Sequence, residues 1–415
     1  MKIKLFFCFI IFSLLFSCSE SLEVDLIKVG TPITMELSEF RNSVKILEPR
    51  RIVETGKIYV YGNYIFVSDV HKGIHVIDNS NPVTPVSKAF IKILGNEDIS
   101  IKDNYLFADS AIDLVVFDIS DLENIHIVER LKNVFSRYDY QAPEGLDHLN
   151  YKDFNYNKAI IVDWEIKFEK REEHMYYWFE DGIRMTNDVA FAEYSKSTTG
   201  TGGSLARFQI VGNHLYTVGS YEMAIFDIAT LEAPRLENTQ YSGWNIETMF
   251  HADGYLYLGS TNGMYIYDVA TNPSLPEFVS EFTHWEGCDP VVVDGDYAYL
   301  TLRGGNACGQ LESVLEVIDV SDKLNPSLLG QYTLDNPYGL GFKGNNLYVC
   351  DGTSGLKIFD KSDPNNLVLV KDFENITAKD VIALEDVLIM IGDGVLYQYR
   401  YRQNSLLLIS TYKFN

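Results

Sequence analysis

The sequence has 415 residues, of which 46% are hydrophobic and 22% charged, a composition typical of a folded chain rather than a disordered one. Its formal net charge is -24, and its pI is about 4.7. Nucleic acids and anionic bilayers bind to basic surfaces. We therefore exclude nucleic acid as a partner, and we expect membrane contact only through a covalent lipid.

The first residues predict an export signal. Lys2 and Lys4 precede an apolar run from Leu5 to Phe16, interrupted only by Ser13. This run is too short to remain as a membrane-spanning helix, but its length suits the hydrophobic region of a signal peptide. We assign residues 1–17 to the signal.

Leu15-Phe16-Ser17-Cys18 resembles the lipobox of bacterial lipoproteins. The resemblance implies that Cys18 becomes the lipidated N-terminus, with fatty acids such as palmitate holding the protein on a membrane surface. The alternative is an ordinary cleaved signal with an incidental cysteine. Because Ser19 replaces the Asp that retains lipoproteins at the inner membrane, we expect an outer-membrane lipoprotein, facing the periplasm or the cell surface.

From about residue 51 onward, one unit recurs: a turn, a strand rich in aromatic and branched residues, a gap, and a second strand that ends in Asp. The closing aspartates lie 40 residues apart between Asp78 and Asp118. Degenerate copies at 157–163 and 385–390 bring the number of units to about eight. A period near 40 with short strands is typical of a propeller blade.

We therefore predict an all-β fold, a β-propeller of about eight four-stranded blades, or seven if a degenerate copy is not a blade. Residues 51–415 form one propeller domain in this interpretation, and residues 18–50 are an ordered lead-in. The final copy has four strands of its own between residues 378 and 412.

Endings such as Leu114-Val115-Val116-Phe117-Asp118 resemble the LVIVD-repeat family of bacterial secreted and surface proteins. The resemblance extends over about residues 50–415. It implies a propeller, and it supplies no reaction and no catalytic residue.

The closing aspartates suit a structural role. Asp and Ser side chains accept hydrogen bonds from turn amides, whereas metal ligands would have to converge from different blades. We expect turn capping at Asp78, Asp118, Asp227, Asp268, Asp319 and Asp360.

Two copies contain insertions, at about 165–203 and at 303–313. Both are interpreted as loops between the second and third strands of a blade, so both should rise from one face. Long loops with aromatic residues favour a binding surface, although residues 176–179 could instead fold back onto a blade. The candidate binding residues are Trp164, His174, Tyr176, Tyr177, Trp178, Trp285, Asp289 and Arg303.

The run from Thr198 to Gly203 lacks the Lys of a phosphate-binding loop and precedes a strand rather than a helix. We interpret it as a flexible hinge.

Cys288 and Cys308 are expected on the same edge of one blade, where a disulfide is plausible outside the cytoplasm. A metal site that uses both thiols and His284 is the alternative. Cys350 should be a core residue.

The beginnings of the innermost strands should line the central channel, where they could bind ions or small ligands or simply be solvated. The candidates are Asp98, Arg207, Glu247, Asp289 and Asp380.

We assign no catalytic residue, no metal and no cofactor. The sequence favours a surface-anchored, non-catalytic binding propeller with an unknown protein or glycan partner. The alternatives are a hydrolase or lyase that acts on an envelope polymer at the channel mouth, and a structural component of an envelope complex.

Overall fold

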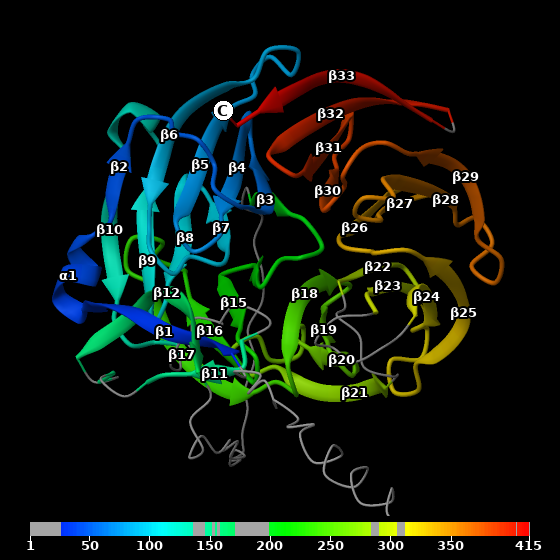
Figure 1. Cartoon of the computed structure of the whole chain (residues 1–415). Helices are drawn as coiled ribbons and strands as arrows, with labels where there is room; N and C mark the ends of the chain where they lie inside the picture. Colours follow the sequence, from blue (N-terminus) through cyan, green and yellow to red (C-terminus); the bar gives the residue numbers. More distant parts are fainter. Residues whose placement is uncertain are drawn as a thin grey trace, which may run out of the picture.

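The structure is a computed structural model, and it describes residues 26–135, 146–151, 154–155, 158–170, 199–283, 290–304, 312–403 and 405–414. Within these ranges the strands form eight sheets, and seven of them are four-stranded antiparallel meanders, one of which gains a further strand on each edge. The innermost strands of the seven meanders neighbour one another in a closed ring (Figure 1). The fold is a β-propeller.

Each blade uses consecutive strands, from the channel outward. Blade 1 has β3 (Thr55–Tyr61), β4 (Tyr64–Asp69), β5 (Gly73–Asp78) and β6 (Val86–Lys92); blade 2 has β7 (Ile99–Lys102), β8 (Tyr105–Ser110), β9 (Asp113–Asp118), the short helix η1 (Leu122–Asn124) and β10 (His126–Leu131). Blade 3 has β14 (Phe208–Val211), β15 (His214–Val218), β16 (Glu222–Asp227) and β17 (Arg235–Tyr241); blade 4 has β18 (Ile246–Ala252), β19 (Tyr255–Ser260), β20 (Gly263–Asp268) and β21 (Glu277–Thr283).

The remaining blades follow the same order. Blade 5 has β22 (Val291–Asp294), β23 (Tyr297–Leu302), β24 (Ser313–Asp319) and β25 (Ser327–Leu334); blade 6 has β26 (Leu340–Lys343), β27 (Asn346–Cys350), β28 (Leu356–Asp360) and β29 (Val368–Phe373). Blade 7 has β30 (Asp380–Ala383), β31 (Val387–Gly392), β32 (Val395–Arg402) and β33 (Ser405–Lys413), as expected for a final copy that owns four strands.

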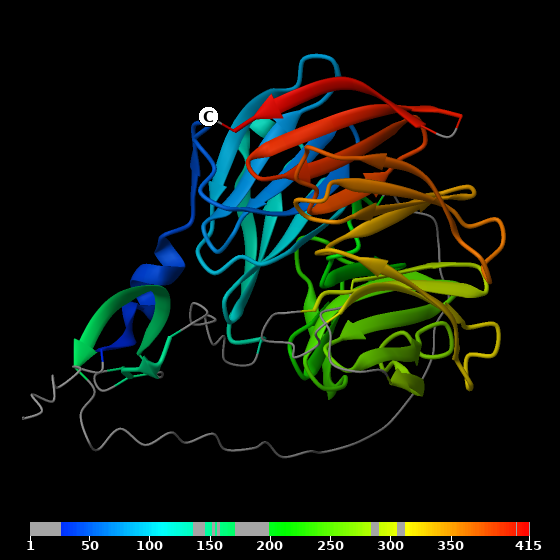
Figure 2. The ribbon, with the colours of Figure 1, turned by 45° about the vertical axis from the view of Figure 1, so that its right-hand side comes forward.

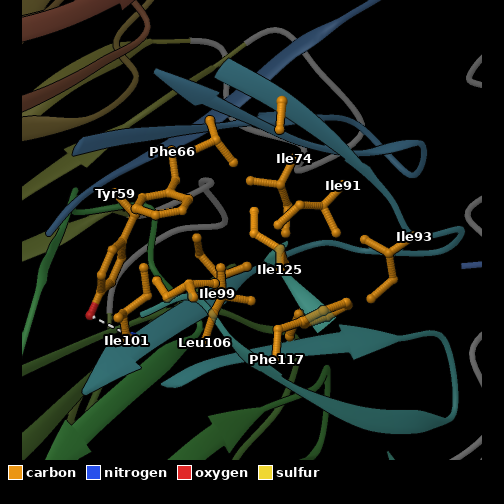
Figure 3. Packing of buried hydrophobic residues seen from close by; sticks show 14 of the residues in the cluster. Tyr59, Phe66, Ile74, Ile91, Ile93, Ile99, Ile101, Leu106, Phe117 and Ile125 are labelled. Atoms are coloured by element: carbon orange, nitrogen blue, oxygen red, sulfur yellow. Dashed lines mark hydrogen bonds between the residues drawn. The ribbon is translucent and has the colours of Figure 1, made fainter. Parts of the chain in front are cut away.

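Apolar side chains pack between each pair of neighbouring blades, so the core is a ring of seven clusters. Figure 3 shows the cluster between blades 1 and 2, where Tyr59 and Phe66 meet Ile99 and Leu106. The Tyr59 hydroxyl accepts a hydrogen bond from the amide of Ile101 at 3.1 Å. Because successive side chains of a strand point to opposite faces of the sheet, each blade presents one face to the preceding blade and the other face to the following blade.

The prediction of a propeller is confirmed, and the eighth sheet shows which copy is degenerate. The copy at 157–163 lies at the start of β12 (Ala159–Lys170), which pairs with β1 (Leu26–Glu36). With β11 (His148–Leu149) they form a three-stranded sheet outside the ring (Figure 2). The long insertion therefore connects the fourth strand of blade 2 to the first strand of blade 3, instead of interrupting a blade.

Within the described part of the lead-in, residues 37–47 pack against the propeller. The helix α1 (Leu37–Asn42) buries Phe40, and Arg41 forms an ion pair with the buried Asp113 of blade 2 at 2.8 Å. The strand β2 (Lys45–Leu47) then pairs with β6 and extends blade 1 at its outer edge.

Blades 7 and 1 meet without exchanging a strand. The amides of Asn79 and Gln398 form reciprocal hydrogen bonds of 2.9 and 2.6 Å, and the Thr55 hydroxyl donates to the carbonyl of Gly392 at 3.1 Å. Buried apolar side chains from both blades form one cluster between the two sheets. Side chains therefore close the ring.

Residues 199–206, which we call the channel segment, cross the centre of the ring (Figure 1). Its strand β13 (Thr201–Gly202) pairs with β3 of blade 1, and the Gly200 amide donates to the Ile101 carbonyl of blade 2 at 2.9 Å. The Ser204 hydroxyl accepts from the amide of Leu340 in blade 6 at 2.8 Å. The channel segment is therefore bonded to blades 1, 2 and 6.

The interpretation of this glycine run as a flexible hinge is wrong. A Cβ atom on Gly200 would lie 2.3 Å from the Tyr59 ring, and one on Gly203 would lie 2.2 Å from the carboxylate of Asp380. The glycines are needed because the backbone passes close to the blades.

Candidate functional site

The innermost strands all begin at one face of the ring, which we call the loop face; the opposite face, with the short hairpin turns, is the turn face. A hollow of about 320 Å³, the mouth hollow, lies at the centre of the loop face. Six blades and the channel segment form its wall: Gly56, Lys57, Ser68, Val70, His71, Asn96, Glu97, Leu205, Arg207, Glu247, Thr248, Pro290, Arg303, Pro337 and Tyr338. Through Leu205, the channel segment contributes to the wall of the hollow.

Arg207 connects three blades in the wall of the mouth hollow. Its guanidinium pairs with the carboxylate of Glu97 and donates to the carbonyls of Ile246 and Glu247, each at 3.2 Å. Its backbone amide donates to the carboxylate of Asp98. Burial opposes the charge, but the Glu97 and Glu247 carboxylates raise the pKa of Arg207 above its usual value. This arginine is a fixed positive charge.

The two glutamates beside Arg207 differ in their proton affinity. Burial tends to raise the pKa of both carboxyl groups. At Glu97 the positive charges of Arg207 and Lys57 outweigh burial and lower the pKa. At Glu247 burial dominates, and the pKa is raised.

Asp98 anchors the wall. Its carboxylate accepts hydrogen bonds from the amides of Ile99 at 2.8 Å and Phe208 at 3.1 Å, and Lys57 Nζ lies 3.4 Å away. The side chain is 5% exposed. This carboxylate is therefore structural: it joins the start of blade 2 to the start of blade 3.

A second set of aspartates, which the sequence reasoning missed, fixes the loops that enter the blades. Asp69, Asp109 and Asp351 are buried at the ends of second strands. Asp351 accepts from the amides of Asp335 and Asn336 at 2.8–3.2 Å, and Asp109 accepts from those of Glu97 and Asp98 at 2.9–3.1 Å. Asp69 does the same for residues 53 and 54. The sequence feature that could have revealed these aspartates is the recurrence of an Asp at the end of the second strand in three copies of the repeat.

Arg303, a binding-face candidate from the sequence, follows β23 and lies at the wall of the mouth hollow. Its guanidinium lies over the ring of Tyr338, 4.3 Å from the ring centre. Among the residues that the structure describes, no carboxylate forms an ion pair with it. Such stacking holds a guanidinium in place while its N–H groups remain available.

A groove of about 220 Å³ between blades 2 and 3, the side groove, adjoins the mouth hollow, because Glu97 and Arg207 line both. Tyr221 lies at its wall and makes a T-shaped contact with Trp244, with ring centres 5.1 Å apart. Tyr221 is 43% exposed and Trp244 is 47% exposed. Neither aromatic residue was predicted, because both lie in short loops.

The other predicted channel residues are placed as follows. Asp98, Arg207, Glu247 and Asp380 all lie around the channel, as expected. Asp380 is fully buried between the channel segment and Gly339, and burial raises its pKa to about 7. No group of three or more potential metal ligands occurs within the described ranges.

Trp164 does not reach the mouth hollow. It lies in β12 outside the ring, 7% exposed, where its ring contacts that of Tyr151 with centres 5.7 Å apart. Its role there is packing. Several predicted residues lie outside the described ranges: Cys18, His174, Tyr176, Tyr177, Trp178, His284, Trp285, Cys288, Asp289 and Cys308.

The predicted turn caps are confirmed, since each closing aspartate accepts a hydrogen bond from an amide two or three residues later. Cys350 is buried and free, as expected of a core residue. No described helix is both long and apolar enough to cross a bilayer.

Comparison with known proteins supports the architecture. The family described as LVIVD repeat matches residues 54–90, 96–132, 252–284, 288–334 and 340–374. A protein from Lactobacillus plantarum is similar in structure, with 13% identity, a TM-score of 0.53, and coverage of 86% of this chain and 96% of that one.

A chain of a mitotic checkpoint complex is similar with 9% identity, a TM-score of 0.51, and coverage of 84% of this chain and 88% of that one. At such identities these likenesses concern the fold alone. The search of curated proteins found no match. The five matched segments correspond to blades 1, 2, 4, 5 and 6, and this agreement of repeat and blade identifies the chain as an LVIVD-repeat β-propeller.

Proposed function

We propose that this protein is a non-catalytic binding module, held at an outer membrane by lipid on Cys18, which takes its ligand at the loop face. The observation that carries the proposal is the mouth hollow: six blades form its wall, and five of them contribute a charged side chain, namely Lys57, Glu97, Arg207, Glu247 and Arg303. Pockets with a few well-placed polar groups are typical binding sites.

The bonding of the carboxylates favours binding over catalysis. Glu97 is paired with Arg207, and Asp98 accepts two backbone amides and faces Lys57. A general acid or base must be free to exchange its proton with the reacting group. These carboxylates instead hold the wall of the hollow together.

Binding can be tested with the chain from residue 19 onward, used to capture partners from envelope fractions. The test variant combines Arg303→Gln and Trp244→Ala. Neither change leaves a buried charge without its partner, because Arg303 has no carboxylate partner among the described residues. We expect this variant to lose the captured partner while its melting temperature is unchanged.

The matched control changes Arg235→Gln and Phe278→Ala, near the starts of the outer strands of blades 3 and 4 on the turn face, where Arg235 is 70% exposed and Phe278 is 55% exposed. This variant should capture as well as the wild type. A further variant replaces residues 171–198 by a Gly/Ser sequence of equal length, which keeps the channel segment intact. If all variants recover the same partner equally, the loop face is not the binding surface.

The membrane anchor is tested separately. Cys18→Ala should move the protein from the membrane fraction to the soluble fraction, and mass spectrometry of the wild type should detect a lipid-modified N-terminus. If the variant stays with the membranes, the lipoprotein proposal is wrong.

An envelope-polymer hydrolase or lyase is a second candidate, favoured by one observation. Glu97 and Glu247 lie in one hollow, and their pKa values shift in opposite directions, the pattern of a general base and a general acid. Glu247→Gln should then abolish polymer cleavage, followed by the release of reducing ends or of unsaturated products. Equal release by the wild type and this variant would remove Glu247 from the reaction.

A further inference from the structure

We propose that the ligand of the loop face is an acidic oligosaccharide, with a carboxylate bound by Arg303 and another of its sugar rings stacked on Trp244, which borders the side groove through its contact with Tyr221. This inference rests on the proposed binding function and names its ligand class. The mouth hollow and the side groove together form the site.

Arg303 supplies the anion-binding group. Its guanidinium is held over Tyr338 at 4.3 Å and forms no ion pair with a described residue. The planar guanidinium matches a carboxylate with two parallel hydrogen bonds. Since its position is already fixed by stacking, binding loses little conformational freedom.

One cation of the hollow has no ion pair with a described residue. Lys57, Arg207 and Arg303 line the mouth hollow together with Glu97 and Glu247. Arg207 pairs with Glu97, and Lys57 lies 3.4 Å from the carboxylate of Asp98. Arg303 is therefore the cation that an anionic ligand can engage. Because the chain has a net charge of -24, most of the remaining surface would repel an acidic ligand.

The aromatic pair supplies a platform for a sugar ring. Tyr221 and Trp244 are about half exposed, and their T-shaped contact fixes the position of the indole. The side groove, which Tyr221 lines, shares Glu97 and Arg207 with the mouth hollow. A rigid indole offers a large apolar face with little entropy to lose. A ligand with apolar ring faces and acidic groups fits both parts.

A sugar chain fits this surface better than an extended peptide. Peptides commonly bind by adding a strand to an exposed sheet edge. At the channel, the inner edge of β3 is already paired with β13. Short polar side chains such as Ser68 and Ser220 lie at the walls, where hydroxyl groups of a ligand find partners.

The test measures dissociation constants by titration calorimetry on the full-length chain in mild detergent. The probes are trimers of galacturonate, mannuronate and glucuronate, their neutral methyl esters, and triglutamate. We expect at least one acidic trimer to bind about tenfold or more tighter than its own ester, as a charged bidentate contact implies.

The variants separate the two contacts. Arg303→Gln should abolish the difference between acid and ester, and Arg303→Lys should restore it in part. Trp244→Ala should weaken acid and ester alike, by about tenfold. Arg235→Gln, on the outer strand of blade 3, should change nothing. Recovery of the intact probe after titration distinguishes binding from cleavage.

Equal binding of acid and ester would overturn the recognition of the carboxylate. Binding of triglutamate alone, with the same dependence on Arg303, would replace the sugar by a peptide. If no probe binds but the variant that combines Arg303→Gln and Trp244→Ala still loses its envelope partner, the ligand class is wrong and the binding function stands. If the envelope partner is also unaffected, both proposals fail.

Discussion

The two faces of the propeller use aspartate in different ways. On the turn face, Asp118 and its counterparts close the third strands, are partly exposed, and accept an amide from their own turn. On the loop face, Asp69, Asp109 and Asp351 close second strands, are buried, and accept amides from a segment 11 to 16 residues earlier in the chain.

The difference shows how one repeat serves two purposes. The caps of the turn face stabilise a hairpin connection locally, so every blade can use the same one. The buried aspartates of the loop face join a loop to a sheet, and the loops differ from blade to blade. The repeated residues therefore build the ring, and the irregular ones build the mouth hollow.

The largest expected effect is that of Asp351→Ala in blade 6. The change leaves the amides of Asp335 and Asn336 without an acceptor, and it removes one of the two carboxylate partners of the largely buried Lys357, at 3.0 Å, while Asp372 remains at 3.3 Å. We expect the free energy of unfolding, measured in urea, to fall by about 3 kcal/mol or more. Asp360→Ala, at the other end of the same blade, should have a much smaller effect. Equal losses would remove the distinction between the faces.

Gly203→Ala should have the next largest effect, because the new methyl group would meet the Asp380 carboxylate. Such overpacking costs about 1–3 kcal/mol, to be measured by the same urea titration. The control is Gly219→Ala, whose Cβ would have one neighbour, at 3.9 Å. If both variants are as stable as the wild type, the channel segment is not tightly packed.

The buried carboxyl group of Asp380 should make stability depend on pH. Burial raises its pKa from 3.8 to about 7, so between these values the folded state binds more protons than the unfolded state. Stability then falls as pH rises from about 4 to 7, by at most about 1.4 kcal/mol per pH unit for this group.

Asp380→Asn should reduce this dependence, because the amide is neutral throughout. Urea titrations of both proteins at pH 5, 6, 7 and 8 measure the two slopes. The variant should also be the more stable protein at pH 8. Parallel curves for the two proteins would show that the carboxyl group does not titrate in this range.

The smallest effect is expected for Asp118→Ala on the turn face. The carboxylate accepts a hydrogen bond from the amide of Ser120 at 2.8 Å, and the hydroxyl and the N–H of this serine lower the pKa of Asp118. Because water can replace this acceptor, we expect a loss of under about 1 kcal/mol. A loss comparable with that of Asp351→Ala would contradict the comparison.

The sequence predicted those features that recur. The period near 40 residues gave the propeller, and the repeated Asp gave the turn caps. The copy at 157–163 was misleading because a strand that ends in Asp is the same local pattern in a blade and in β12. Only its partner, β1, distinguishes the two, and strand pairing is not a local property.

The site was predicted only in part. Asp98, Arg207 and Glu247 were placed at the channel because each precedes or begins an innermost strand. The Tyr221–Trp244 pair brings together loops from blades 3 and 4 and has no sequence signal. The glycines of the channel segment were taken as a sign of mobility, although glycine is equally required where backbones approach closely.

The closure between blades 7 and 1 has a consequence for the order of folding. Each blade is made of consecutive strands, so it can complete its meander as soon as its own residues have left the ribosome or the export machinery. The innermost strands of blades 1 and 2 gain a later partner, since β3 pairs with β13 and Ile101 bonds to Gly200 only after both meanders have been made. The Asn79–Gln398 amide pair forms only when the last blade arrives, and the ring is then finished by docking two complete sheets rather than by threading a strand.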